Sequence, residues 1–360
     1  MPDRCLHDFL HIFGSIRSAV CASYYERPQG QRFFSRNKQL LFCYELAQRS
    51  IALLNEHIRL AGNTSTGAPM QIRHTLRCKT WLVVFAIALV VAGCSRMNLA
   101  YRNLHLLIPW SLNDYLDMNS EQQKAFRSQL REHLSWHCKT QLPSYLDKIE
   151  HLQQQVRQGD VDEAALRMHY RDAKDAIDAI VLEIKPTTTR LLRDLDDEQV
   201  RQLNASLEDE RRKREDKYLK PPLEKQISER AERMQERVDQ WLGSTSTSQR
   251  QRIREWAHTL GPQNQLWLDN RAQWQRALVA ALEKRDEQGF EEQVAKLLQD
   301  RESLWTAEYQ AAFARAEQAG IDLAVDLFAS SDAKQRHHLD GQLEDLRKDL
   351  GSLDCLPKSR

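Results

Sequence analysis

The 360-residue sequence contains little glycine and proline, 12 and 10 residues respectively. No segment alternates apolar and polar residues with β-branched enrichment, so the pattern of a half-buried strand is missing. Residues 94–360 are instead dominated by Ala, Leu, Glu, Gln, Arg and Lys, a composition typical of helices. We therefore expect an all-α fold, either an antiparallel helical bundle or an elongated helical array, joined by short turns.

An excess of one charge is also missing, since 52 Lys and Arg stand against 51 Asp and Glu. Residues 1–93 hold 11 of the basic and 5 of the acidic side chains, which leaves residues 94–360 with a net charge of −5. This balance lacks the basic footprint of a nucleic-acid-binding protein, and we expect no such partner. The densest charge run, Glu208 to Lys217, mixes both signs and predicts a solvated helix face with i,i+4 ion pairs.

A long apolar run is absent as well. The run from Trp81 to Ala92 has 12 residues, whereas a membrane-spanning helix needs about 20. Arg73, Arg77 and Lys79 precede this run, and small residues follow it. That order is typical of a secretory signal. The ending Val91-Ala-Gly-Cys94 resembles a bacterial lipobox.

The lipobox resemblance implies a lipid-anchored protein. Residues 70–93 would be the signal peptide, cleaved between Gly93 and Cys94, and Cys94 would carry the acyl chains. Ser95, in place of aspartate, implies sorting to the inner leaflet of the outer membrane, with the body facing the periplasm. Two or three acyl chains give stable anchoring. A buried core helix is the alternative, but it leaves the cysteine after a small pair unexplained.

Residues 1–69 precede the signal, although a signal should open a protein. We interpret them as the product of a start codon placed too early, with a cytoplasmic extension as the alternative, and exclude them from the fold. The apolar residues 96–117 are expected to pack on the core, with the membrane interface as the alternative. Pro221-Pro222 is the clearest break and divides an N-terminal helical half, 94–220, from a C-terminal half, 221–360.

Helix starts are marked by an N-cap residue with glutamine three positions later. Such starts occur at Asn119–Gln122, Asp196–Gln199 and Ser246–Gln249, with a looser copy at Ser330–Gln335. They resemble the Leu-Thr-x-x-Gln motifs of small helical periplasmic chaperones, most closely at Leu195–Gln199, although no copy has Leu-Thr.

Other local features refine the expected helices. We expect Asp160 to cap a helix and Pro186 to kink or break it. Leu260, Trp267, Trp274 and Ala281 recur every seven residues and predict a core stripe.

A catalytic signature is absent: we find no nucleophile elbow, phosphate loop or dinucleotide fingerprint. The best metal candidates are His133 and His137, which share a helix face one turn apart and follow Glu132. A metalloprotease would have glutamate immediately after the first histidine, and a third ligand is not evident. We interpret these residues as packing and expect no cofactor and no enzymatic activity. A metal-binding protein or hydrolase using Glu132, His133 and His137 is the alternative.

Three cysteines remain after the predicted cleavage. Cys94 would carry lipid, and Cys138 and Cys355 form an even pair in an oxidising compartment. A disulfide between Cys138 and Cys355 is one interpretation. Two buried or tail thiols that never meet are the other, because distance cannot be read from sequence.

A set of residues after the lipobox resembles one protein family. These residues are Leu99-Ala-Tyr101-Arg-Asn-Leu104, Trp110, Asp114-Tyr115, the Gln122 helix start, Trp136-His137 and Leu142-Pro143-x-Tyr145. The family consists of uncharacterised helical lipoproteins from Gram-negative bacteria, classed as a domain of unknown function. The resemblance implies location and fold but brings no activity. For function we expect a non-enzymatic scaffold or chaperone-like module that binds envelope proteins through helix faces or a groove.

Overall fold

The described part of the chain is almost entirely helical. In the computed structural model it comprises residues 101–353 and Cys355, so the predicted signal 70–93, Cys94 and residues 1–69 lie outside it. No strand occurs in the described part, and the all-α prediction is confirmed. The helices are α6 (Leu104–Leu116), α7 (Ser120–Trp136), the π-helix η1 (His137–Gln141), α8 (Leu142–Gln158), α9 (Glu163–Arg193), α10 (Asp197–Tyr218), α11 (Leu223–Leu242), α12 (Thr247–Thr259), α13 (Gln263–Leu282), α14 (Phe290–Gln299), the 3-10 helix η2 (Arg301–Leu304), α15 (Ala307–Ala329) and α16 (Ala333–Gly351).

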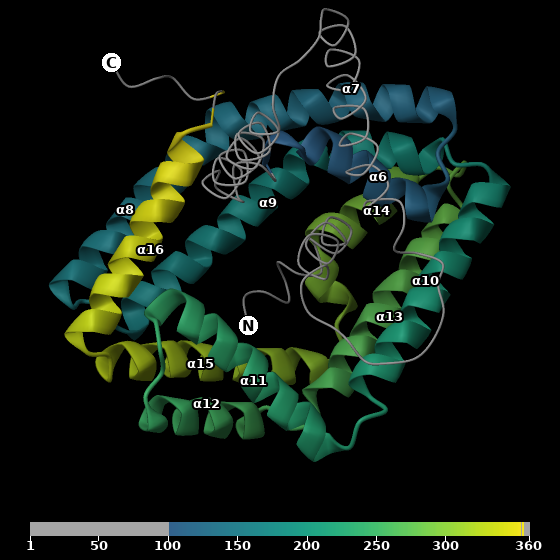
Figure 1. Cartoon of the computed structure of the whole chain (residues 1–360). Coiled ribbons are helices and arrows are strands. Elements are labelled where there is room, and N and C mark those ends of the chain that lie inside the picture. Colours follow the sequence, from purple (N-terminus) through teal and green to yellow (C-terminus); the bar gives the residue numbers. More distant parts are fainter. Residues whose placement is uncertain (1–100, 354, 356–360) are drawn as a thin grey trace, which may run out of the picture. The chain divides into compact units, whose positions relative to one another are not determined.

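These helices belong to one compact unit of the chain. In Figure 1, α7, α8, α16, α15, α13 and α10 lie along the border of this unit, and α9 runs diagonally inside it. Several helices that are distant in the sequence pack together: α8 against α16, α10 against α13, and α9 against both α14 and α15. The longest helix, α9, has 31 residues. Each of the pairs named above joins a helix that precedes Pro221-Pro222 to one that follows it, so contacts between the two parts of the sequence hold this unit together.

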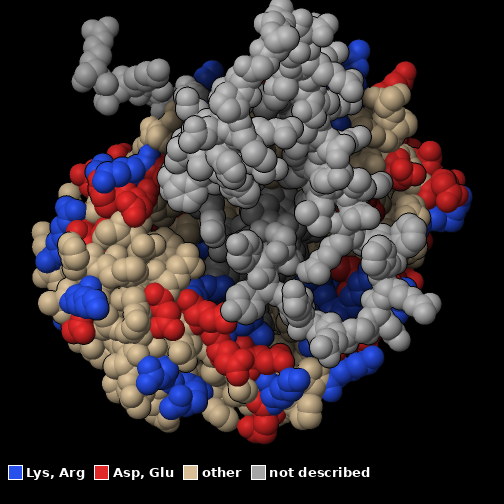
Figure 2. All heavy atoms as spheres, viewed as in Figure 1, with Lys and Arg blue, Asp and Glu red and all other residues tan. Residues whose placement is uncertain are grey.

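Two main hydrophobic clusters fill the space between the helices. The larger cluster joins α6, α10, α13 and α14 and includes Leu203, Leu282 and Phe290. The second joins α11, α12 and α15 around Ile253 and Trp256. Burying one side chain of this size contributes about 1.5–3 kcal/mol, so tertiary packing rather than helix propensity supplies most of the stability. Outside the clusters, basic and acidic side chains lie interspersed on the face visible in Figure 2.

The first described helix, α6, divides its apolar residues between core and solvent. Ile108 and Leu116 are buried, and Leu112 packs against the larger cluster. Leu106 and Trp110, one turn apart, are 54% and 52% exposed. The expectation that this segment packs on the core is therefore correct for one face of α6 and wrong for the other.

Four of the helix starts form two reciprocal clasps. α7, α10, α12 and α16 each begin with a capping box that ends in a glutamine. Gln122 Nε2 donates to Gln199 Oε1 at 3.0 Å, and Gln199 Nε2 donates back to Gln122 Oε1 at 2.8 Å. Gln249 and Gln335 exchange the same two bonds at 3.1 and 2.9 Å. Each clasp thus joins the N-termini of two helices.

The glutamine amides also satisfy carbonyls at the ends of neighbouring segments. Gln199 Nε2 lies 3.2 Å from the Leu116 carbonyl oxygen and 2.9 Å from that of Asp117, where α6 ends. Gln335 Nε2 donates to the Ser244 carbonyl at 3.0 Å. Helix ends leave backbone groups without intrahelical partners. The first clasp serves the starts of α7 and α10 and the end of α6, and Gln122 Nε2 also donates to the Asp194 carbonyl at the end of α9.

The helix starts predicted at Asn119, Asp196 and Ser246 are confirmed by their capping boxes. The looser copy predicted at Ser330–Gln335 is also a full capping box, because Asp332 is the N-cap and its side chain accepts from the Gln335 backbone N–H at 2.8 Å. The cap predicted at Asp160 is wrong. Asp162 caps α9, while the Asp160 N–H bonds to a carbonyl in the last turn of α8.

The break predicted at Pro186 does not occur, since α9 continues through it to Arg193. Proline removes one helical hydrogen bond and crowds the carbonyl four residues earlier, here that of Leu182. Pro186 is exposed, and Leu182 is 58% exposed. The turn that loses the bond therefore faces solvent, where water can satisfy the carbonyl.

Candidate functional site

His133 is held by two side chains of α9. Its Nδ1 lies 3.0 Å from Glu183 Oε1, and its Nε2 lies 2.8 Å from Thr187 Oγ1. Glu132, by contrast, is exposed and accepts a bond from Gln129 at 3.4 Å. Both ring nitrogens of His133 therefore contact α9, whereas Glu132 contacts a residue of its own helix, α7.

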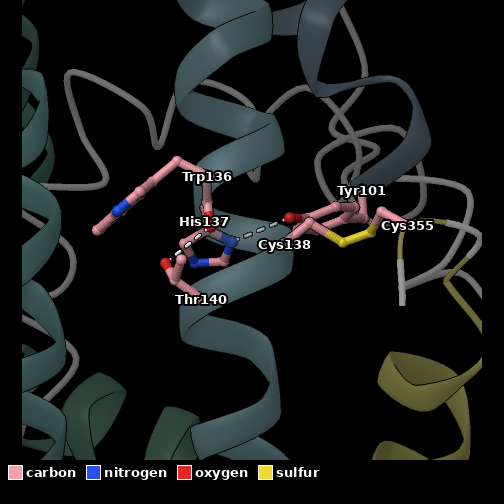
Figure 3. Close-up of a disulfide and its surroundings, with 6 residues drawn as sticks. All are labelled: Tyr101, Trp136, His137, Cys138, Thr140 and Cys355. Atoms are coloured by element: carbon pink, nitrogen blue, oxygen red, sulfur yellow. Dashed lines mark hydrogen bonds between the residues drawn. A yellow bond between two sulfur atoms is a disulfide. The ribbon is translucent and has the colours of Figure 1, made fainter. Parts of the chain in front are cut away.

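His137 lies in a different environment, in the π-helical turn η1 between α7 and α8 (Figure 3). Its Nδ1 lies 2.9 Å from the Tyr101 hydroxyl, and the ring of Tyr145 meets it edge-on with centroids 5.5 Å apart. Residues 101–353 and 355 contain no group of three or more His, Cys, Asp and Glu side chains that could hold a metal ion. Glu132, His133 and His137 therefore interact with different partners and do not converge on one site.

A disulfide lies next to His137. Cys138 belongs to the π-helical turn η1, is 1% exposed, and is bonded to Cys355 with a Cα–Cα distance of 6.1 Å. The Tyr101 side chain lies beside the two sulfur atoms (Figure 3). The pairing that the sequence left open is therefore made in this structure, and it ties the C-terminal end of the chain to the start of α8.

The burial of His137 predicts that the stability of the protein depends on pH. Burial lowers the pKa of His137, because a buried site disfavours the imidazolium. Burial and the nearby Tyr145 raise the pKa of Tyr101 to about 12, so Tyr101 stays a neutral phenol throughout the pH range in which histidine titrates. An unfolded histidine binds a proton below about pH 6.5, so the folded state loses stability as the pH falls below that value.

We expect the melting temperature to fall between pH 7 and pH 5, and to fall less in a His137→Gln variant. Thermal unfolding at both pH values measures the difference. His337→Gln, on the exposed side of α16, is the matched control and should keep the wild-type slope. Equal slopes for His137→Gln and the wild type would contradict the assignment.

A cavity of about 230 Å³ opens within the larger hydrophobic cluster. Its wall is formed by α6, α7, α9, α10, α13 and α14, together with η2 and the start of α15. Most of the lining is aliphatic or aromatic, including Leu191, Leu207, Leu297, Trp274 and Trp305. Protein interiors are close-packed and contain few voids larger than a water molecule. An apolar cavity with a few polar groups is therefore a candidate binding site.

An ion-pair group forms one part of the wall. Glu210 lies 3.1 Å from Arg271 and also pairs with Arg214 on its own helix. The three side chains are only 10–18% exposed. Burial alone would raise the pKa of Glu210, but the two arginines outweigh it and lower the pKa. The carboxylate is therefore charged, and it fixes Arg271 at the cavity.

Two further polar groups line the cavity. Arg301, at the start of η2, is half-buried, and its side chain has no hydrogen bond or ion pair within the described residues. Asn270 Oδ1 is buried, also without a hydrogen-bond partner among them. Buried polar atoms in folded proteins are nearly always satisfied. The Arg301 guanidinium and Asn270 Oδ1 are therefore polar groups of the wall that a guest could satisfy.

Some residues of this wall belong to patterns that are visible in the sequence, although the cavity itself is not. Trp274 belongs to the predicted core stripe, and its indole Nε1 donates to the Leu297 carbonyl at 3.0 Å. The charge run from Glu208 to Lys217 forms exposed i,i+4 pairs as expected, for example Lys213 with Asp209. Glu210 and Arg214 within that run turn inward instead. An inward pair of opposite charges four residues apart cannot be told from an exposed one by spacing alone.

The fold and the cavity define an all-α protein with a largely apolar internal cavity. The chain belongs to the family of unknown function DUF6279, whose model matches residues 114–310. Membership in an uncharacterised family is thus confirmed, and its lipoprotein character stays a prediction. No curated protein and no solved structure matches the chain. Among the described helices, none is long and apolar enough to cross a membrane.

Proposed function

We propose that the protein is a non-enzymatic, lipid-anchored binding module of the cell envelope that holds an apolar guest in its cavity. The observation that carries the proposal is the cavity itself, with its aliphatic and aromatic wall. Engineered apolar cavities of about 150 Å³ stay dry and bind benzene. A larger cavity of the same character is therefore suited to an apolar guest. Anchored through Cys94 in the outer membrane, such a module would capture apolar groups that envelope molecules expose.

The anchoring is tested by the intact mass of the protein extracted from cell membranes. We expect a mass that matches Cys94 to Arg360 plus a diacylglyceryl group and an acyl group. A mass that matches an unlipidated chain from Met1 would contradict both the signal and the anchor.

The cavity is tested with N-phenyl-1-naphthylamine, an uncharged fluorophore whose phenyl ring fits the space while its naphthyl group lies at the opening. The protein is the processed chain, residues 94–360, carrying Cys94→Ser and made without the signal peptide, so that no detergent is needed. We expect saturable binding. Leu191→Trp, which fills part of the cavity, should weaken it roughly tenfold, the equivalent of about 1.4 kcal/mol of overpacking.

Leu339→Trp is the matched control for overpacking. Leu339 lies on α16, is also partly buried, and packs in other clusters. We expect it to leave fluorophore binding unchanged. If both tryptophan variants bind the fluorophore like the parent chain, the guest does not occupy this cavity and the proposed function fails.

A further inference from the structure

The geometry points to a single acyl chain with an anionic head group as the guest, with its charge bound by Arg301. This inference rests on the proposed function, since it names the ligand of the same cavity. It joins three observations: the size of the apolar space, the unmatched guanidinium in its wall, and the buried acceptor at Asn270.

The size of the cavity favours one short aliphatic segment. If about 150 Å³ holds the six carbons of benzene, then 230 Å³ holds roughly nine carbon atoms at the same density. Two acyl chains, or an amphipathic helix with several apolar side chains, need more room. A single chain can place about nine carbons inside and let any remainder leave through the opening.

The charge in the wall favours an anion at one end of that chain. Arginine stays protonated at all physiological pH values, and a partly buried charge without a counter-charge is unfavourable. Arg271 already has Glu210 at 3.1 Å, whereas Arg301 has no ion pair with a described residue. A carboxylate or phosphate on the guest would supply the counter-charge and would accept charge-assisted hydrogen bonds from the Arg301 guanidinium.

The acceptor in the wall adds a second polar contact. Asn270 Oδ1 is buried and has no donor in the part of the chain that the structure describes. A hydroxyl of the head group, or a water held by it, would donate to this oxygen. The polar groups that interrupt the apolar wall thus match a molecule that is apolar along its length and polar at its head.

The experiment compares decanoate with decanol, which differ in charge but share a ten-carbon chain. Binding is measured by calorimetry at neutral pH, below micelle formation, with the processed chain, residues 94–360, carrying Cys94→Ser and made without the signal peptide. We expect decanoate to bind roughly tenfold more tightly than decanol, since a hydrogen bond to a charged group is worth about that factor. Arg301→Gln should remove the difference without changing decanol binding.

Two variants are controls for the loss of charge. Arg301→Lys keeps the positive charge and should retain part of the preference for decanoate. Arg276→Gln removes an exposed arginine of α13 that does not line the cavity, and it should bind like the parent chain. If Arg276→Gln lowers decanoate binding as much as Arg301→Gln, the anion is not bound at this site.

The remaining outcomes separate the two proposals. Equal affinity for decanoate and decanol overturns the anionic head group and leaves the cavity as an apolar site. Binding of neither, with the fluorophore still bound and still sensitive to Leu191→Trp, overturns the acyl chain but not the proposed function. Loss of fluorophore binding as well overturns both.

Discussion

Removal of the Cys138–Cys355 disulfide is expected to lower the free energy of unfolding by about 3–5 kcal/mol. The two cysteines are 217 residues apart in the sequence, and a cross-link that closes a longer loop removes more entropy from the unfolded chain. Packing in the folded state adds to the stabilisation, because Cys138, Leu142 and Leu353 form one buried cluster around the bond. Urea unfolding of a Cys138→Ala, Cys355→Ala variant measures the change.

Reductant provides the control for this variant. Wild-type protein in reductant should approach the stability of the double variant, and the double variant should not respond to reductant. Hydrogen exchange should increase first near Leu353 and the last turn of α16, because the bond holds that end against α8. A double variant as stable as the oxidised wild type would show that packing alone holds this corner.

Gln199→Leu is expected to cost about 3 kcal/mol, the second-largest effect. Gln199 is 6% exposed, and its amide serves the N-cap of α10, two carbonyls at the end of α6, and Gln122. Leucine is similar in size but leaves these groups unsatisfied, at about 1–3 kcal/mol for each fully buried group. Chemical denaturation with one fitted transition measures the change.

Gln299→Leu is the matched control, because Gln299 is an exposed glutamine on α14. It should change stability by less than about 0.5 kcal/mol. Gln122→Leu should couple with Gln199→Leu, since each loses the same pair of bonds, and the double variant should cost less than the sum. Strict additivity would mean that the reciprocal bonds do not contribute.

Capping was predictable because it depends on residues within four positions of one another. Asn119, Asp196 and Ser246 could each be found without knowing where their helices lie. The pairing of glutamines was not predictable, since Gln122 and Gln199 are 77 residues apart and meet only after α6, α7 and α10 have packed. The error at Asp160 has a similar cause: two aspartates compete, and the end of α8 decides between them.

The cavity could not be predicted for a further reason. Its wall takes side chains from six or more helices. Whether these side chains leave a space between them depends on how the helices pack, which the sequence does not state directly. Arg301 stands in the polar sequence Asp300-Arg-Glu-Ser, which resembles an ordinary surface turn. What distinguishes Arg301 is the absence of a partner within the described residues, and that property has no sequence signature.

The disulfide also gives the polypeptide a second covalent path. Residues 138 to 355 form a closed loop through the two sulfur atoms, so a single cut of the backbone anywhere between them leaves one molecule. Hydrolysis in the linker at Pro221-Pro222, for example, would yield two pieces that stay joined and share the packed pair α10 and α13. A nicked chain of this kind keeps its partners at high effective concentration. One proteolytic event between Cys138 and Cys355 would therefore leave both pieces in one molecule, which the proposed lipid at Cys94 would still hold.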